Sequence, residues 1–276
     1  MTATGSTWAG GDFGERARCV LAPNANHMTL DGTNTWVLRE PGARRSVVVD
    51  PGPSVPAHLD AVAEAAGDVA AVLLTHHHAD HSEAAREFAE RVGCGVRALD
   101  PAYRLGEEGL AEGDVVEVDG LEVRVVATPG HTADSLSFVL PAERTVLTGD
   151  TVLGRGTTVV AHPDGQLGAY LGSLERLHRL AEAQQITAVW PGHGPVIHDA
   201  LGALDFYLAH RRERLAQVEQ ALATLRSGDA GPAGPQPAAE DLPRRVVEIV
   251  YQDVDPVLWG AAELSVRAQI AYLTHR

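Results

Sequence analysis

Apolar runs of strand length end abruptly in polar residues at four places in the chain. Residues 69–75 lead directly into four histidines and one aspartate within positions 76–81. Residues 123–127, 145–148 and 186–190 lead into Thr-Pro-Gly-His, Gly-Asp and Pro-Gly-His. Loops that follow strands hold functional side chains on a rigid scaffold. The pattern therefore predicts that His, Asp and Gly residues from four strands meet at one edge of an α/β protein.

Helical spacing of apolar residues alternates with the strand-like runs along the chain. It predicts helices over residues 58–66, 82–92, 166–183, 200–227, 243–251 and 257–274. Further strands are expected at residues 46–49, 96–99, 114–118, 122–127 and 135–140. Periodicity by itself indicates only a mixed α/β protein.

A change of composition separates the last part of the chain from the rest. Residues 228–240 contain Gly-Pro twice and a further proline, which is typical of a linker. We therefore expect a large domain over residues 1–227, which includes the long helix, and a small helical appendage over residues 241–276.

The histidine-rich segment has the spacing of a metal site. Imidazole nitrogen and carboxylate oxygen are ligands that zinc prefers. If the loop after the strand is extended, His76 and His78 point to one side and His77 to the other. Asp80 and His81 begin the next helix and approach the same space from the opposite direction. One segment therefore supplies two pairs of ligands to two adjacent metal ions, and His77 is expected to order the loop instead.

Composition narrows the classes of function. The chain has 276 residues, a formal net charge of −15 and two cysteines. This acidity disfavours loose attraction to nucleic acid or to an anionic membrane. Two thiols in a chain of this size indicate no disulfide framework, and we find neither a secretory signal nor an apolar run long enough to span a membrane. We expect a cytoplasmic protein without a membrane partner.

Together, the motifs resemble the metallo-β-lactamase superfamily. The resemblance rests on His-x-His-x-Asp-His at residues 76–81, Thr-Pro-Gly-His at 128–131, Gly-Asp at 149–150 and Pro-Gly-His-Gly-Pro at 191–195. It implies a four-layer αββα sandwich, in which helices cover two sheets packed face to face. It also implies two zinc ions: one held by His76, His78 and His131, a second held by Asp80, His81 and His193, and Asp150 bridging them.

Three further motifs resemble the beta-lactamase-like protein 2 branch of this superfamily. They are Leu-x-Gly-Thr-Asn-Thr at residues 30–35, Gly-x-Gly-Thr-Thr at 154–158 and Tyr-x-x-His-Arg at 207–211. The branch carries a C-terminal winged helix, but here no β-hairpin wing is expected after the last helix. Residues 241–276 have four positive and five negative side chains, whereas a nucleic-acid-binding winged helix is basic. We expect a packing or dimerisation element, and so a possible homodimer.

The branch motifs also supply candidate substrate-binding residues. Thr33, Asn34, Thr157 and Thr158 are candidates for the mouth of the site. Tyr207, His210 and Arg211 are candidates for meeting an anionic substrate. Turn and capping hydrogen bonds explain such residues equally well. Asp134 is a candidate partner that supports the loop of His131.

The predicted activity is zinc-dependent hydrolysis. Two zinc ions lower the pKa of a bridging water from about 15.7 toward 7 and so make hydroxide at neutral pH; Asp80 and this hydroxide are the expected catalytic groups. A small acyl substrate, namely a thioester, ester or lactone, fits the acidic chain. Single-stranded endoribonuclease activity is the alternative, and β-lactam hydrolysis and persulfide chemistry at a single iron are further alternatives. The complete second ligand set favours the dinuclear hydrolytic form.

Overall fold

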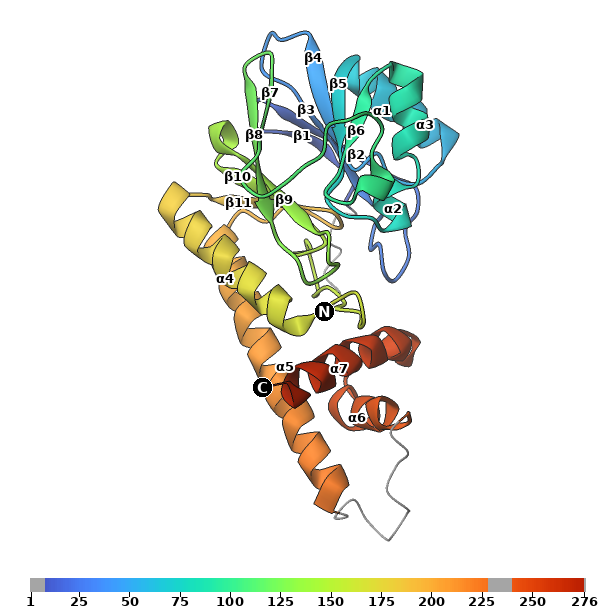
Figure 1. Ribbon diagram of the computed structural model, residues 1–276, viewed down its shortest axis with the longest axis vertical. Helices are drawn as coiled ribbons and strands as arrows, with labels where there is room; N and C mark the ends of the chain where they lie inside the picture. The colour runs from blue at the N-terminus through green and yellow to red at the C-terminus, as the bar shows by residue number, and fades with distance from the viewer. Residues whose placement is uncertain (1–7, 228–239, 276) are drawn as a thin grey trace, which may run out of the picture.

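Strands with buried side chains form two facing sheets in the computed structural model, which describes residues 8–227 and 240–275 (Figure 1). The first sheet has the order β1 (Gly11–Phe13), β2 (Ala17–Leu21), β3 (Asn34–Leu38), β4 (Arg45–Val49), β5 (Asp68–Leu73), β6 (Gly95–Arg97). The second has the order β11 (Ala188–Pro191), β10 (Thr145–Gly149), β9 (Leu136–Leu140), β8 (Leu121–Ala127), β7 (Val115–Val118). Each sheet mixes antiparallel and parallel pairs, the parallel ones being β4–β5, β5–β6 and β10–β11.

Apolar side chains fill the space between the two sheets. Trp36 from the first sheet stacks on Trp190 from the second, with ring centroids 5.0 Å apart, and Phe138 and Leu140 lie fully buried beside them. Every residue of β9 and of β10 is buried, as expected for strands covered on both faces. This inter-sheet core makes the sheet ends a rigid base for the loops.

Helices cover the outer face of each sheet. The first sheet carries α1 (Pro56–Ala66), α2 (Ala79–Ser82) and α3 (Ala85–Val92), packed through Leu59, Val62 and Phe88. The second carries α4 (Leu167–Gln184) and α5 (Ala200–Ser227), packed through Leu174, Tyr207 and other residues. Short 3-10 turns lie at Pro101–Tyr103 and Pro141–Glu143. The predicted αββα arrangement is confirmed.

The described end of the chain is helical and has its own small core. Helix α6 (Leu242–Val250), the 3-10 turn η3 (Pro256–Leu258) and α7 (Trp259–Thr274) pack against the second half of α5 (Figure 1). Val218 and Leu222 of α5 meet Val246 and Val266 in this core. Within residues 240–275 no strand forms a wing. The predicted linker falls almost entirely outside the described residues, so the domain boundary stays a prediction.

One predicted helix is divided in the structure. Residues 82–92 were expected to form a single helix, but the segment is split into α2 and α3. The loop after β4 causes the break, because Gly52 donates to the carbonyl of His81 (3.2 Å) and accepts from the amide of Ala84 (3.1 Å). As a result α2 begins at Ala79 and places Asp80 and His81 in its short turn.

Candidate metal centre

The seven candidate ligands come together at one end of the two sheets. The segment of residues 76–81 follows β5, His131 follows β8, Asp150 follows β10 and His193 follows β11. Close approach depends on glycine at one position in particular: a Cβ on Gly192 would lie 2.7 Å from Asp150 Oδ1 and 2.7 Å from His81 Cε1. Real Cβ atoms do not come this close, so only glycine fits between the two side chains.

Three histidines form the first cluster. The Nδ1 atom of His78 lies 3.1 Å from His76 Nε2 and 3.0 Å from His131 Nε2. His76 and His131 are almost fully buried, whereas His78 is half-buried and faces a cavity. Three ring nitrogens therefore converge on one point.

The second cluster combines a carboxylate with two histidines. The Oδ2 atom of Asp80 lies 3.1 Å from His193 Nε2 and 3.3 Å from His81 Nε2. The two imidazole nitrogens are 3.3 Å apart. Thr33 Oγ1 donates to the same Asp80 oxygen over 3.3 Å, which fixes the carboxylate toward the histidines.

Asp150 lies between the two clusters. Its Oδ2 atom is 3.7 Å from His131 Nε2 in the first cluster and 3.4 Å from His193 Nε2 in the second. Its Oδ1 atom is buried and makes no hydrogen bond with any of the described residues, although His81 Nε2 is 3.4 Å away. A buried carboxylate oxygen without a partner is costly, and a cation would relieve that cost.

The donor geometry fits zinc. Tetrahedral zinc with Zn–N bonds of about 2.0–2.1 Å sets its ligand nitrogens roughly 3.3 Å apart, close to the 3.0–3.3 Å found within the two clusters. Within the described residues, the donor atoms group as His76, His78, His131; as His76, His81, Asp150; and as Asp80, His81, His193. The structure thus supports a His/Asp metal site, while two zinc ions and the seven-ligand assignment stay predictions.

Outward hydrogen bonds orient each ring, and the sequence did not reveal most of their partners. His131 Nδ1 donates to the carbonyl of Val159 (2.8 Å), and His193 Nδ1 donates to that of Gly32 (3.1 Å). His81 Nδ1 faces Asp50 Oδ2 at 2.8 Å. Such outer partners fix the tautomer of a ligand and tune the metal.

Asp50 is the functional residue that the sequence reasoning missed. Its carboxylate is buried and also accepts from the amide and the hydroxyl of Thr75, the residue before His76. It follows β4 in the same way that the other acidic and histidine residues follow their strands. Because Asp50 directly follows the strand expected at residues 46–49, the rule that functional polar residues lie at strand ends would have identified it.

The structure agrees with the predicted roles of His77 and Asp134. His77 points away from the clusters, as expected, and its Nδ1 lies 2.8 Å from Asp134 Oδ1. Asp134 also accepts from the hydroxyl of Thr132 (2.8 Å), so it does brace the loop that carries His131. It makes no hydrogen bond to His131 itself within the described residues, because Val159 and Thr158 occupy the ring's outer side.

The two clusters favour different charge states. Burial is the main reason that the pKa of His76 and of His131 is lowered, and it lowers the pKa of His78 to about 4. In the second cluster burial acts the same way, but the nearby carboxylates outweigh it and raise the pKa of His193 to about 9. Burial would raise the pKa of Asp80, yet His81 and His193 hold it far below its usual range. A divalent cation would neutralise this carboxylate-rich end and release protons.

The clusters open into a cavity of about 580 Å³, here called the chamber. His78, Asp80, His131, Asp150 and His193 face it. Its volume lies within the roughly 300–1,000 Å³ of small-molecule sites. The opposite wall comes from the C-terminal helices, which the sequence did not place near the metal centre.

The candidate substrate residues divide into two groups. Thr157, Thr158, His210 and Arg211 line the chamber. Thr33 and Asn34, predicted at the substrate mouth, and Tyr207, predicted to meet an anionic substrate, do not line it, and each is at most 2% exposed. Thr33 holds Asp80, and the side-chain amide of Asn34 donates to the carbonyls of Pro191 and Gly194, both at 2.9 Å.

Helix α5 fastens the loop that orients His131. The hydroxyl of Tyr207 accepts from the amide of Leu153 (2.8 Å), and Arg211 donates to the carbonyl of Thr158. Thr158 Oγ1 in turn lies 3.2 Å from His131 Nδ1. The Tyr-x-x-His-Arg motif therefore acts on the metal centre through this loop.

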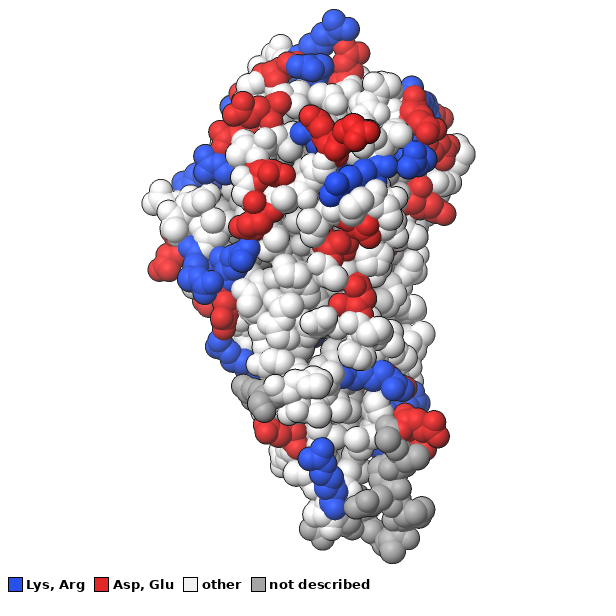
Figure 2. Space-filling view, in the orientation of Figure 1, with Lys and Arg blue, Asp and Glu red and all other residues white. Residues whose placement is uncertain are grey.

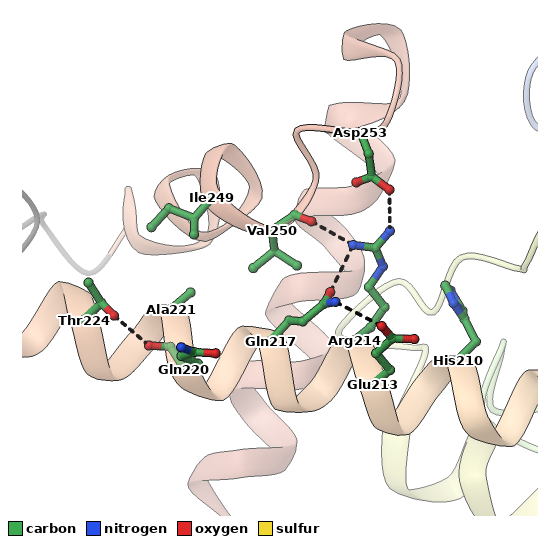
Figure 3. Close-up of a pocket in the computed structure, with 10 residues that line it drawn as sticks. All are labelled: His210, Glu213, Arg214, Gln217, Gln220, Ala221, Thr224, Ile249, Val250 and Asp253. Carbon is green, nitrogen blue, oxygen red and sulfur yellow. Dashed lines mark hydrogen bonds and ion pairs between the residues drawn. The ribbon is translucent and has the colours of Figure 1, made fainter.

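A second cavity of about 640 Å³ lies beside the chamber, between α5 and α6 (Figure 3). None of the seven candidate ligands lines it. It shares His210 and Arg214 with the chamber. Its remaining lining is mostly polar, with Glu213, Gln217 and Asp253 among the side chains.

Comparison with known proteins identifies the family. A sequence profile described as the Metallo-beta-lactamase superfamily matches residues 28–193. The chain belongs to the metallo-beta-lactamase superfamily. Together with the His/Asp clusters, membership makes metal-dependent hydrolysis its activity class.

Individual relatives in this superfamily extend the match over most of the chain. A beta-lactamase-like protein 2 homolog of Drosophila melanogaster is 30% identical over 277 residues, covering 92% of this chain and 86% of that protein. An atrochrysone carboxyl ACP thioesterase of Aspergillus chevalieri is 32% identical over 219 residues, covering 77% and 67%. A solved beta-lactamase domain protein from Burkholderia ambifaria shares the fold, with a TM-score of 0.75 at 22% identity over 98% of this chain and 91% of that one. The resemblance drawn from the motifs is confirmed.

No described helix combines the length and the apolar character that crossing a membrane requires.

Proposed function

We propose that this protein is a dinuclear zinc hydrolase that cleaves a small acyl substrate, with a thioester as the first choice over an ester or a lactone. The observation that carries the proposal is the pair of His/Asp clusters joined by Asp150 and facing one chamber. A relative named as an ACP thioesterase, 32% identical, supports the choice of thioester.

The chain's own residues would divide the work as follows. His76, His78 and His131 would hold one ion, Asp80, His81 and His193 the other, and Asp150 would contact both. Zinc bound there supplies a Lewis acid that activates water near neutral pH and polarises the substrate carbonyl. Asp80 faces the chamber as an anion and can accept a hydrogen bond from the attacking water, which orients it. Hydrolysis forms a C–O bond, breaks the C–S bond and yields a carboxylate and a thiolate, which takes up a proton to become the thiol.

The charge distribution supports an acyl substrate over RNA. A protein that binds single strands tracks the backbone with a positively charged groove. On the face seen in Figure 2, Arg side chains lie interspersed with acidic ones, and the middle of that face has few charges. The formal net charge of −15 points the same way.

The test is a substrate panel for the zinc-loaded protein. It contains acyl thioesters, esters, lactones, a β-lactam and labelled single-stranded RNA, with the Asp80→Ala variant as the blank. We expect thioester cleavage by the wild type and none by the variant. Equal rates for both proteins on every substrate would defeat the proposal.

RNA binding gives a second readout. A ribonuclease should bind single strands with a salt dependence of about −0.7 in log–log slope per phosphate neutralised. Binding of that kind, together with RNA cleavage that the Asp80→Ala variant lacks, would replace the acyl assignment with the endoribonuclease alternative.

A further inference from the structure

We propose that the C-terminal helices form an acyl-binding wall, so that the preferred substrate is a thioester of an extended apolar acyl chain. This inference rests on the proposed function and adds the identity of the acyl part. The acyl-binding wall is defined as the apolar and aromatic residues that this unit contributes to the chamber: Tyr251, Val254, Leu258, Ala261, Ala262 and Leu264. The unit also contributes Ser265, whose hydroxyl accepts from the amide of Val160 over 3.3 Å.

The wall faces the metal centre across one cavity. Its side chains are apolar or aromatic, and they line the same chamber as Asp80 and Asp150. Met28 and Leu30, from the loop before β3, add further apolar surface. Apart from Asp80 and Asp150, the described lining has no acidic side chain. A substrate whose carbonyl lies at the metal centre would therefore extend its acyl chain along an apolar surface.

Two apolar side chains of the lining are left open to solvent. Met28 is 51% exposed and Leu264 is 40% exposed, although both line the chamber. Exposed apolar surface in a cavity mouth marks a ligand-binding groove. An apolar chain would cover both residues on binding.

The arginines of the chamber make most of their contacts with the protein itself, although Arg211 Nε is buried without a hydrogen-bond partner among the described residues. Arg155 pairs with Asp31, and Arg211 donates to the carbonyl of Thr158 while its guanidinium lies over the ring of Tyr170, 5.0 Å from the centroid. They serve to hold loops in place. The chamber is therefore built less for a polyanion than for an apolar group.

Arg214 fastens the wall to α5. It reaches across the second cavity and donates to the carbonyl of Val250 (2.7 Å) and to Asp253 (3.3 Å) (Figure 3). Its guanidinium also lies 4.8 Å from the ring centroid of Tyr251. These contacts fix the turn between α6 and η3, from which the wall begins.

A thioester series measures the effect of the wall. Burial of one methylene changes an equilibrium constant about fourfold, and a chamber that stays partly open gives less. We expect kcat/KM of the zinc-loaded wild type to rise two- to fourfold per added methylene, from acetyl to octanoyl N-acetylcysteamine thioesters. A flat series in an active enzyme would overturn the inference.

Two substitutions in the C-terminal helical unit distinguish a specific role of the wall from a general effect of adding a ring to this unit. Ala261→Phe fills the chamber and should lower the octanoyl-to-acetyl ratio of kcat/KM at least tenfold. Val257→Phe adds a ring at a position that is 58% exposed and outside the chamber lining, so it should leave the ratio within twofold. Equal ratios for both variants would contradict a role for the wall.

A binding measurement works without catalysis. Octyl N-acetylcysteamine thioether, which cannot be hydrolysed, should bind the metal-free wild type in calorimetry and bind Ala261→Phe at least tenfold more weakly. If Ala261→Phe does not fold by circular dichroism, Leu264→Ala at the exposed rim takes its place, with an expected loss of threefold or more. Failure of every thioester to react would contradict the proposed function. Equal thioether affinity of the wild type and the wall variants would contradict this inference alone.

Discussion

The metal end of the chamber and the acyl-binding wall opposite it are built in different ways. At the metal end, side chains from β5, β8, β10 and β11 sit on a double sheet, and hydrogen bonds orient the rings of His81, His131 and His193 from outside. The wall comes from a short helical unit whose core is shared with the second half of α5, and Ala268 of α7 also packs into the core of α4 and α5. The difference places the candidate metal ligands on the double sheet and the proposed acyl-binding residues on helices packed against it.

Removal of the bridging carboxylate tests the metal end most strongly. Asp150→Ala should lower kcat/KM by about 10³-fold or more, because both of the proposed metal sites would lose a ligand. Metal content by elemental analysis should fall with it, and chelation of the wild type should have the same effect on activity. Asp60→Ala, an exposed aspartate paired with Arg91, is the control and should change neither quantity.

Cavity-forming substitutions test whether the two regions are independent. Phe138→Ala in the inter-sheet core should lower the free energy of unfolding by about 3–5 kcal/mol. Val266→Ala in the helical unit removes roughly two methyl groups and should cost about 1.5 kcal/mol. Native-state hydrogen exchange of Val266→Ala should become faster in residues 242–274 and in the second half of α5, which shares this core, but not in the two sheets. Uniform acceleration across the chain would show one cooperative unit instead.

Removal of the Asp50 charge beside His81 tests whether this carboxylate strengthens metal binding at the second cluster. Asp50→Asn keeps the shape of the side chain but removes the negative charge next to His81 Nδ1. It should weaken binding of one metal ion by about 10–100-fold and leave the other unchanged, as measured by competition with a chelator. Asp134→Asn is the matched control, because its carboxylate bonds to His77 and Thr132. A similar loss in both variants would deny Asp50 a specific role.

Mild acid should destabilise the part of the protein that contains His58, and we expect this effect on the free energy of unfolding to be the smallest of the four predicted effects. Burial lowers the pKa of His58 below its ordinary value of 6.5, so the unfolded state binds the extra proton more readily. Stability from this group is present above pH 6.5 and is lost as the pH falls, by at most about 1.4 kcal/mol per pH unit. Urea unfolding of wild type and His58→Gln between pH 7 and 5 should show a shallower slope for the variant. If the free energy of unfolding fell equally steeply with pH in the wild type and in His58→Gln, His58 would not be the source of the acid effect.

Local patterns predicted most of the fold because they follow from short-range chemistry. Strand-length apolar runs and helical spacing located β5, β8, β10, α4 and α5 to within a few residues. The break between α2 and α3 was not visible, because it depends on hydrogen bonds to Gly52, far away in the sequence. Asp50 was missed although it followed the same rule as the candidate ligands, since a turn explained it equally well.

The sequence alone determined that His and Asp side chains would gather where strands end, because ligand chemistry and the spacing of residues 76–81 are local properties. It also determined the family and the helical character of the last part of the chain. Only the tertiary structure decided that Thr33, Asn34 and Tyr207 are buried supports, and that Leu258, Ala261 and Leu264 line the same chamber as the metal centre. Those facts depend on which distant surfaces pack together, and packing between distant segments leaves no signal in the residues on either side considered alone.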